Sequence, residues 1–370
     1  MKKIRLLQLF LLIFIINFNG FGQSQEYNAD KNIDTFITSQ MKTLGIPGMA
    51  VAVVKNGKIM KVTTYGFANL EWDRKVTTQS TFQIASTTKL ITSTLLLKTL
   101  FNGKINLDDP IEKYLDSIPS AWKNIQIKHL ISHSSGLREY KGDMYASTAA
   151  VVKALKDSLL EYIPGRGQKY AQADFMLLGY IFEKIYGKPF TKLLADEITV
   201  PLKMNDGGYD MEQKTDNYLR TKLIKEKVTT YYDYEGKIHA YKFMYPQYYY
   251  TAGGYFASIN DLVNWAIGLD KEILFTKAFS EEYIYGKDSI GNKLSTYTKA
   301  GWILENENGI QYAGHSGGPG LADIIRFPNE GYTFIVLTND GEILPYFARA
   351  IATFYLSNLP GNQKIEKFDR

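Results

Sequence analysis

A serine and a lysine stand three residues apart in the segment QIASTTKLITSTLLLKTL, which covers residues 83–100. On a helix, Lys89 would lie on the same side as Ser86 and Leu96, whereas Lys98 would point the opposite way. A charged amine is costly against apolar surroundings, so burial of Lys89 would favour a neutral form that can take a proton. A base beside a hydroxyl activates a nucleophile, and the pair therefore predicts acyl-transfer chemistry.

Three segments have the S-x-x-K spacing, namely Ser39–Lys42, Ser86–Lys89 and Ser120–Lys123. The first lies at the end of an amphipathic helix and the third follows a proline in a polar loop, so both are predicted to lie on the surface. Only Ser86 begins a long apolar helix, whose N–H groups and dipole can stabilise negative charge near the hydroxyl. The alternative for this pair is a helix-capping Ser86 with a snorkelling Lys89.

A second candidate nucleophile is Ser316 in the segment GHSGG, which has the G-x-S-x-G pattern of the α/β-hydrolase elbow. That fold places its catalytic histidine after the nucleophile, yet every histidine of this chain precedes Ser316. The following segment, GPGLADIIRFP, also continues as loop and strand where the elbow requires a helix. The context therefore excludes this interpretation.

His129 and His133 are four residues apart in KHLISHSSGL, the spacing of a metal-binding pair on a helix. The segment lacks the adjacent glutamate of H-E-x-x-H, and no third ligand is obvious. We predict a structural role for both residues and no metal site. A zinc enzyme that uses the two histidines is the alternative.

The composition is that of a globular protein with a large core. The 370 residues are 45% hydrophobic, and the net charge of +5 is spread along the chain without a basic block or a zinc-finger spacing. This pattern does not suggest a nucleic-acid partner. The chain has no cysteine, which excludes disulfides, a thiol nucleophile, cysteine-ligated metal and a lipid anchor on cysteine.

The N-terminus has the features of a secretory signal peptide, predicted over residues 1–22. Lys2, Lys3 and Arg5 precede an apolar run over residues 6–18, and small residues follow. The run is shorter than the roughly 20 residues that cross a bilayer. We expect an exported protein, periplasmic or secreted, with no stable membrane anchor.

Both ends of the mature chain carry strand patterns. A helix over residues 33–44 precedes an apolar hairpin that turns at Asn56-Gly57, and three further strands are predicted between residues 309 and 338 before a closing helix. Ser258 and Asp261 predict a capping box for a helix that follows. Strands so far apart in sequence predict one antiparallel sheet built from both chain ends and flanked by helices.

The fold class is therefore α/β (α+β) with an inserted domain. Residues 107–247 are irregular, mostly helical in pattern and interrupted by prolines. We predict a discontinuous α/β domain over residues 23–106 and 248–360, and a mainly helical domain over residues 107–247.

Four segments together resemble the serine β-lactamase and penicillin-binding-protein superfamily, in particular its class C-like branch of esterases, peptidases and β-lactamases. They are IASTTKLIT, IKHLISHSSGL, PGRGQKYAQADFMLLGYIFEKIYGKPF with AGGYFASINDLVNWA, and GHSGG. They occur in the order and approximate spacing of that family and cover nearly all of the mature chain. The resemblance implies a β-lactamase/transpeptidase-like fold with the active site between the two domains.

The resemblance also implies roles for individual residues. Ser86 would be the nucleophile, Lys89 its neighbouring base and Tyr170 the second proton-transfer group. The backbone N–H groups of Ser86 and Gly318 would form the oxyanion hole. The residues that would contact the substrate are Gln172, His315, Ser316 and Gly317.

Two positions depart from the family pattern. Gln172 stands where the Y-x-N motif has asparagine, which keeps an amide but lengthens its reach by a methylene. His315 stands where many members have the lysine of K-T-G, so a fixed positive charge is lost. Many relatives use that lysine to hold the carboxylate of a β-lactam or of a terminal D-alanine. We therefore expect esters or amides without that carboxylate as substrates.

These observations predict a serine hydrolase that needs no metal or cofactor and acts through an acyl-enzyme. Its expected substrate is a small ester, amide or peptide, including one derived from peptidoglycan, and esterase or D-amino-acid peptidase action is favoured over β-lactam hydrolysis. The alternative is a catalytically weak homologue that binds peptidoglycan fragments or a partner protein, because fold resemblance does not confer activity.

Overall fold

The computed structural model describes residues 32–318, 320–343, 346–361 and 364–367. The predicted signal peptide, residues 1–22, lies outside the described residues, as does the start of the predicted closing helix. None of the helices in the described ranges is long and apolar enough to cross a membrane.

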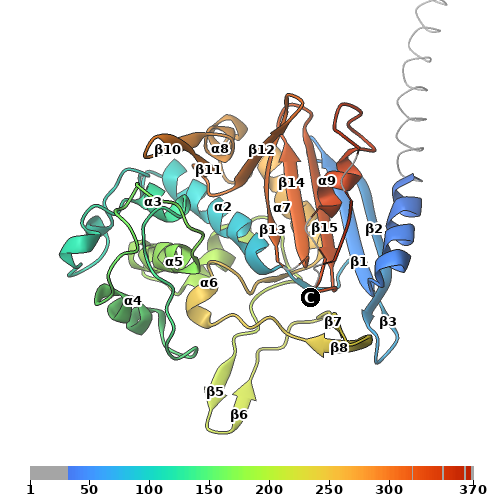
Figure 1. Ribbon diagram of the computed structural model, residues 1–370, viewed down its shortest axis with the longest axis horizontal. Coiled ribbons are helices and arrows are strands. Elements are labelled where there is room, and N and C mark those ends of the chain that lie inside the picture. Colours follow the sequence, from blue (N-terminus) through green and yellow to red (C-terminus); the bar gives the residue numbers. More distant parts are fainter. Residues whose placement is uncertain (1–31, 319, 344–345, 362–363, 368–370) are drawn as a thin grey trace, which may run out of the picture.

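One antiparallel sheet dominates the structure, as the sequence predicted (Figure 1). Its strand order is β10-β11-β12-β13-β14-β15-β1-β2-β3, so the two ends of the chain meet where β15 pairs with β1. The strands are β1 (Gly48–Lys55), β2 (Lys58–Asn69), β3 (Arg74–Lys75), β10 (Lys287–Ile290), β11 (Lys293–Thr298), β12 (Ile303–Glu307), β13 (Ile310–Gly317), β14 (Ala322–Phe327) and β15 (Tyr332–Thr338).

The hairpin of β1 and β2 turns at the predicted dipeptide. Asn56 and Gly57 have φ angles of 49° and 71°. A two-residue hairpin turn of type I′ needs positive φ at both positions, which asparagine and glycine tolerate. The local sequence therefore fixes the register of the strand pair next to the chain-end junction.

Strand β1 is buried on both faces. Ala50, Ala52 and Val54 face the core shared with α2 (Thr88–Phe101) and α7 (Ile259–Asp270), whereas the alternate residues face α9 (Phe347–Ala352) and the helix over residues 32–44. Figure 1 shows α7 and α9 on opposite faces of the sheet. Because side chains alternate along a strand, burial on both faces requires the continuous apolar run seen in the sequence.

The remaining elements lie beside the sheet. The helices and short turns are η1 (Ala85–Thr87), η2 (Ile111–Lys113), η3 (Ser120–Trp122), α3 (Ile127–Ile131), α4 (Thr148–Lys156), α5 (Gln172–Tyr186), α6 (Phe190–Leu194), η4 (Ala195–Thr199), η5 (Gln247–Tyr249) and α8 (Lys277–Ile284). The short strands are β4 (Phe82–Gln83), β5 (Gln213–Thr215), β6 (Tyr218–Arg220), β7 (Thr230–Tyr234), β8 (Lys237–Tyr241) and β9 (Phe256–Ala257).

The mainly helical pattern predicted for residues 107–247 holds only for the first part of that stretch. The later part forms two hairpins, β5–β6 and β7–β8, and the first of them projects at the bottom of Figure 1. Both hairpins turn through a residue with positive φ, Asp216 and Glu235 respectively. Their strands are short and largely exposed, so they lack the apolar alternation from which a strand is predicted.

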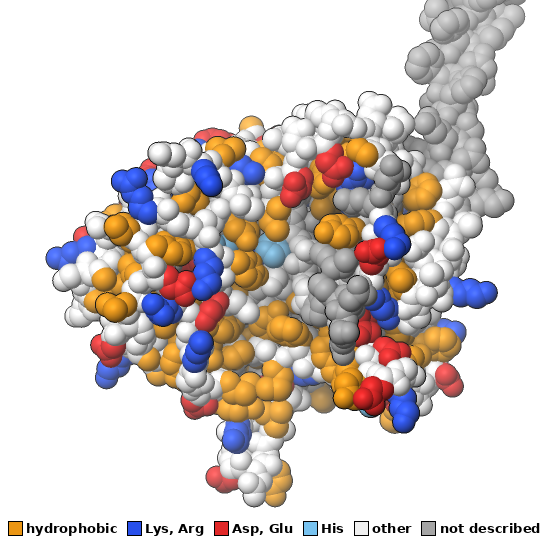
Figure 2. Space-filling model, viewed as in Figure 1, with side chains coloured by type: hydrophobic (Ala, Val, Ile, Leu, Met, Phe, Trp, Pro, Cys, Tyr) orange, Lys and Arg blue, Asp and Glu red, His pale blue; other side chains and the backbone are white. Residues whose placement is uncertain are grey.

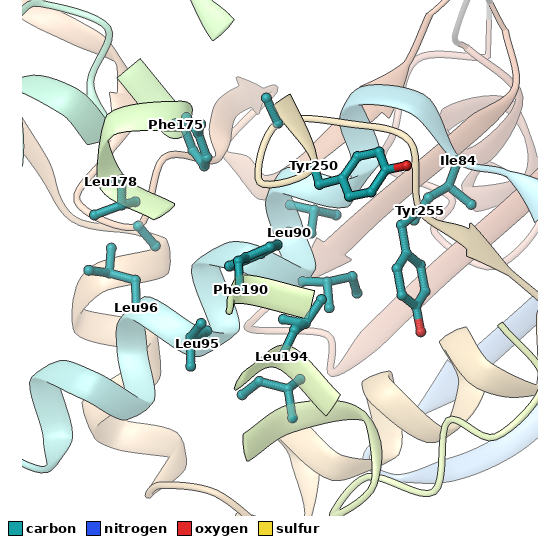
Figure 3. Packing of buried hydrophobic residues seen from close by; sticks show 14 of the residues in the cluster. Ile84, Leu90, Leu95, Leu96, Phe175, Leu178, Phe190, Leu194, Tyr250 and Tyr255 are labelled. Carbon is teal, nitrogen blue, oxygen red and sulfur yellow. The ribbon is translucent and has the colours of Figure 1, made fainter. Parts of the chain in front are cut away.

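Helix α2 runs through the middle of the core between the sheet and the helical part (Figure 3). Its apolar residues, Leu90, Leu95 and Leu96, belong to one cluster with residues of α5 and α6. The core is thus continuous across the predicted domain boundaries at residues 106 and 247, and these boundaries stay a prediction.

Candidate active site

Ser86 lies half-buried on the 3-10 turn η1, directly before α2. The sequence placed it in the first turn of the helix, but the α-helix itself begins at Thr88. Strand β4 pairs with β9 just before this turn, and Ala85 takes a φ of 45°. Non-glycine residues seldom adopt this left-handed conformation, which is found where surrounding structure enforces it, often at functional sites.

The end of β13 packs tightly against this turn. A Cβ on Gly317 would lie 2.1 Å from the carbonyl oxygen of Ile84, so only glycine permits this approach. Thr87 donates its hydroxyl to the carbonyl of His315 at 3.4 Å. Gly318 has open space where a Cβ would point, with no atom of the described residues within 4 Å. The third sequence motif is therefore held beside Ser86.

Lys89 is fully buried one turn beyond the serine. Its Nζ donates to the carbonyl of Ala252 at 2.7 Å, and it lies 4.8 Å from the ring centroid of Tyr170 and 5.3 Å from that of Phe175. Lys98, on the other side of α2, instead forms a salt bridge with Glu197 at 2.8 Å. The helical geometry expected for the two lysines is confirmed.

Tyr170 stands just before α5 and reaches the serine from the helical side. Its hydroxyl donates to Ser86 Oγ at 2.8 Å across 84 residues of sequence. The side chain is 41% exposed, which leaves one side of the phenol open to solvent or to a ligand. The fold thus brings together Ser86, Lys89 and Tyr170, the three residues expected to carry the chemistry.

Gln172, the departure in the Y-x-N motif, is the first residue of α5. Its backbone N–H donates to a carboxylate oxygen of Glu139 at 2.5 Å, and the other oxygen accepts from Ala173 at 3.3 Å. Tyr249 donates to the same carboxylate at 2.6 Å. Glu139 thus occupies the N-terminus of α5, where a negative charge is favoured. The side-chain Oε1 of Gln172 is buried and has no hydrogen-bond partner among the described residues.

His315 is a buried, neutral imidazole. Burial and the positive charge of Lys89 lower its pKa from 6.5 to about 3. Its Nδ1 lies 2.7 Å from the carbonyl oxygen of Ser316, so Nδ1 carries the hydrogen and donates it. The fixed charge that a lysine would supply is therefore absent at this position, as the sequence predicted.

Tyr245 is a contact of the serine that the sequence did not single out. Its ring lies over two glycines, and a Cβ on Gly253 would lie 2.0 Å from that ring. Burial raises the pKa of Tyr245, and a hydrogen bond with the Ser86 hydroxyl partly offsets this effect. The paired glycines of TAGG were the available signal, because an adjacent bulky group explains why neither position bears a side chain. A cavity of about 630 Å³ borders the same tyrosine.

His129 and His133 do not form a helical pair. Helix α3 ends at Ile131, and His133 has a φ of 54°, which turns it away from the helix. His129 Nδ1 accepts the N–H of Gln126 at 3.1 Å, in the capping box of α3. His133 Nδ1 lies 3.0 Å from the carboxyl group of Asp174. Within the described ranges, no three histidine, aspartate or glutamate side chains are placed to hold a metal ion.

The site opens on the face shown in Figure 2, where histidine side-chain surface is visible in a hollow near the centre. Apolar side chains lie beside and below this hollow in the view, and charged side chains are scattered around it.

Comparison with known proteins gives the family. The profile of the family described as Beta-lactamase matches residues 33–353. Protein flp of Staphylococcus aureus (strain MW2) is 23% identical over 344 residues, which are 88% of this chain and 66% of that protein. This chain thus spans slightly less than two thirds of the length of that relative.

Two further matches agree with this result. Penicillin-binding protein 4* of Bacillus subtilis (strain 168) is 27% identical over 346 residues, covering 86% of this chain and 74% of that protein. The structure of a D-amino acid amidase from Ochrobactrum anthropi SV3 superposes with a TM-score of 0.70 at 20% identity, covering 89% of this chain and 98% of the amidase. The match of the family profile to most of the chain shows that this protein belongs to the beta-lactamase family.

Proposed function

We propose that this protein is a serine hydrolase that cleaves an ester or amide through an acyl-enzyme on Ser86. The observation that carries the proposal is the 2.8 Å hydrogen bond between Tyr170 and Ser86, with the buried Lys89 behind the tyrosine ring. A nucleophile in contact with one proton-transfer group and close to a second can be activated without a metal ion.

The proposed reaction begins when Ser86 Oγ attacks the substrate carbonyl. In the reactive form Tyr170 is a phenolate beside a protonated Lys89, and the phenolate takes the proton from Ser86. The positive charge on Lys89 stabilises the negative charge on the phenol oxygen, so the two residues act together as the base. The backbone N–H groups of Ser86 and Gly318 hold the oxyanion of the tetrahedral intermediate. The proton then passes to the leaving group, and water attacks the acyl-enzyme by the same route in reverse.

The proposed substrate lacks a free carboxylate next to the scissile bond. A neutral, buried His315 supplies no charge to hold such a group. This feature favours esterase or D-amino-acid peptidase action over β-lactam hydrolysis, on a small ester, amide or peptide that includes peptidoglycan-derived ones.

A catalytically weak binding protein is the second candidate function. It is favoured by Gln172, whose buried side-chain oxygen has no partner among the described residues and makes no hydrogen bond to Lys89 there. Such a protein would bind peptidoglycan fragments or another protein in the same cleft. One relative is named as a penicillin-binding protein, which supports a binding role for this cleft.

Labelling of the serine tests both candidates. The purified protein is treated with a fluorophosphonate probe and, separately, with a fluorescent penicillin, and the adduct is located by mass spectrometry with Ser86→Ala as the control. Labelling of Ser86 by the fluorophosphonate alone supports the ester or amide hydrolase. Labelling by the penicillin would instead favour a D-alanyl peptidase or a β-lactamase. Absence of both labels would support the binding protein.

Export is also part of the proposal, because residues 1–22 have the pattern of a signal peptide. The mass of the mature protein checks it. A chain that lacks these residues and appears outside the cytoplasm is expected, whereas an intact cytoplasmic chain would contradict export.

A further inference from the structure

We infer that His133 and Asp174 form a buried, uncharged acid–imidazole pair that positions Tyr170. The pair would act through the tyrosine and would not touch substrate. This inference rests on the proposed function, because it concerns the residue that takes the proton from Ser86.

His133 holds the backbone on both sides of Tyr170. Its carbonyl oxygen accepts the N–H of Lys169 at 2.9 Å, and its Nδ1 accepts the N–H of Ala171 at 3.3 Å. Its ring lies 4.7 Å from the ring of Tyr170. His133 therefore contacts the tyrosine ring and holds the backbone N–H groups of the residues before and after Tyr170, which sets the direction in which the phenol points.

The position of His133 is itself strongly determined. The residue is fully buried, and its left-handed backbone follows directly from the end of α3. Tyr162 donates its hydroxyl to the His133 carbonyl at 3.1 Å. Tyr297 packs edge-on against the His133 ring at a centroid distance of 4.7 Å, and its own ring lies 6.4 Å from that of Tyr170. A side chain surrounded in this way cannot move without disturbing Tyr170.

The hydrogen bonds determine where the protons lie. Nδ1 of His133 lies 3.3 Å from the backbone nitrogen of Ala171 and 3.0 Å from Asp174 Oδ2. Because the Ala171 N–H points at Nδ1, we assign the hydrogen between Nδ1 and Oδ2 to a protonated carboxyl group. The imidazole hydrogen is then on Nε2, which is buried and has no partner among the described residues. The other oxygen, Oδ1, accepts the hydroxyl of Ser135. Asp174 therefore donates with one oxygen and accepts with the other.

The surroundings favour this uncharged arrangement. Burial raises the pKa of Asp174 well above its usual value, and the nearby charge of Glu139 acts in the same direction. Burial and the charge of Lys89 hold the pKa of His133 well below 6.5. The groups that face the pair are thus Lys89, Glu139 and His315, which is also neutral. An uncharged pair orients Tyr170. It adds no negative charge that would weaken the effect of Lys89 on the phenol.

Substitutions at Asp174 distinguish an uncharged acid from an anion. The amide of Asp174→Asn can donate to His133 Nδ1 and accept from Ser135, as the protonated carboxyl does. We expect it to be labelled by the fluorophosphonate within about threefold of the wild-type rate. Asp174→Ala and His133→Phe remove the hydrogen bond between the two side chains, so Tyr170 is no longer held in place. A displacement of Tyr170 by about 1 Å is expected to slow labelling on the order of 100-fold.

The measurements separate this inference from the proposed function. If the wild-type protein is not labelled at Ser86, the proposed function fails. If it is labelled, and Asp174→Asn is as slow as Asp174→Ala, an ionised carboxylate is required and the inference is wrong. Labelling of His133→Phe at the wild-type rate would also overturn it.

The pH profile of labelling covers the case in which Asp174→Ala does not fold. Wild-type protein and Asp174→Asn are compared between pH 5 and 9. Superimposable profiles are expected, because the substitution removes no charge. A displacement of the profile by about one pH unit or more would show that the wild-type carboxyl is ionised beside Lys89, contrary to the inference.

Discussion

Two buried histidines lie near the Tyr170 ring, His315 on the sheet side at 6.3 Å and His133 on the helical side at 4.7 Å. Both have a pKa lowered by burial and by the charge of Lys89, so both are neutral. Their hydrogen bonds differ: His315 Nδ1 donates to the next residue's carbonyl, whereas His133 Nδ1 accepts from Ala171. Burial thus removes the charge of an imidazole, and the neighbouring groups decide which nitrogen carries the hydrogen.

The difference separates two tasks. On the sheet side, a neutral imidazole stands where a charged residue would select substrates by their carboxylate. On the helical side, a neutral imidazole holds the proton-transfer residue Tyr170 in place. Substitutions on the sheet side should change which substrates react, and substitutions on the helical side should change how fast they react.

Lys89 acts on both histidines, because its charge lowers the pKa of each. Its substitution should have the largest effect on the rate of acylation. Lys89→Met keeps the length and apolar volume of the side chain but removes the amine that bonds to Ala252. We expect acylation to fall on the order of 1,000-fold, as for loss of a general base. The rate of fluorophosphonate labelling measures it. Lys98→Met, on the opposite side of α2, is the matched control and should label at the wild-type rate, and equal rates for both variants would contradict the role of Lys89.

Substitution at Tyr245 should have a smaller effect than substitution at Lys89. Tyr245→Phe removes the hydroxyl that interacts with Ser86, and Gly253→Ala displaces the ring by filling the space beneath it. We expect each to slow labelling by about 10-fold, the cost of one lost hydrogen bond to the nucleophile. Tyr248→Phe alters a buried tyrosine that packs on Tyr140 and serves as the control. An equal loss of rate in Tyr248→Phe would assign the effect of Tyr245→Phe to packing.

His315→Lys should change which substrates react. It restores the fixed charge, so labelling by fluorescent penicillin, which has a carboxylate, should rise by about 10-fold relative to labelling by the uncharged fluorophosphonate. His239→Lys adds the same charge at an exposed position on β8 and is the control. An unchanged ratio of the two labelling rates would mean that the charge at residue 315 does not select substrates.

The last expected effect concerns stability and not rate, and it lies below neutral pH. His315 has a folded-state pKa of about 3 and an unfolded value near 6.5, so between these values the unfolded chain binds the extra proton. Its contribution to stability is therefore complete above pH 6.5 and is lost as the pH falls. The difference in unfolding free energy between wild type and His315→Gln should shift by about 1.4 kcal/mol per pH unit in that window.

Denaturant unfolding at a series of pH values measures this shift. His239→Gln, at an exposed position, should show none. A pH-independent difference for His315→Gln would contradict the lowered pKa on the sheet side.

Much of the fold was predictable because its signals are local. The turn at Asn56-Gly57 and the capping box of Ser258 and Asp261 depend on residues at most three apart, and the structure contains both. The hairpins between residues 213 and 241 were not predicted, since their exposed strands carry no periodic apolar pattern.

The candidate site was only partly predictable. The motif residues Ser86, Lys89 and Tyr170 were selected from the sequence, and the fold brings them together, but their catalytic roles stay predictions. Tyr245 was missed because it comes from a loop and meets the serine only across 159 residues of chain. The paired glycines of TAGG indicate a bulky neighbour, but they do not specify which residue that neighbour contacts.

The sequence by itself determined which residues could do chemistry, where the local turns and caps lie, and that both chain ends would share one sheet. The tertiary structure alone decided the partners and charges of those residues. Lys89 meets its carbonyl acceptor 163 residues away, and Asp174 meets His133 across 41. The physical reason is that a local hydrogen bond depends on nearby residues, whereas burial, and with it the protonation of a buried group, depends on everything packed around it.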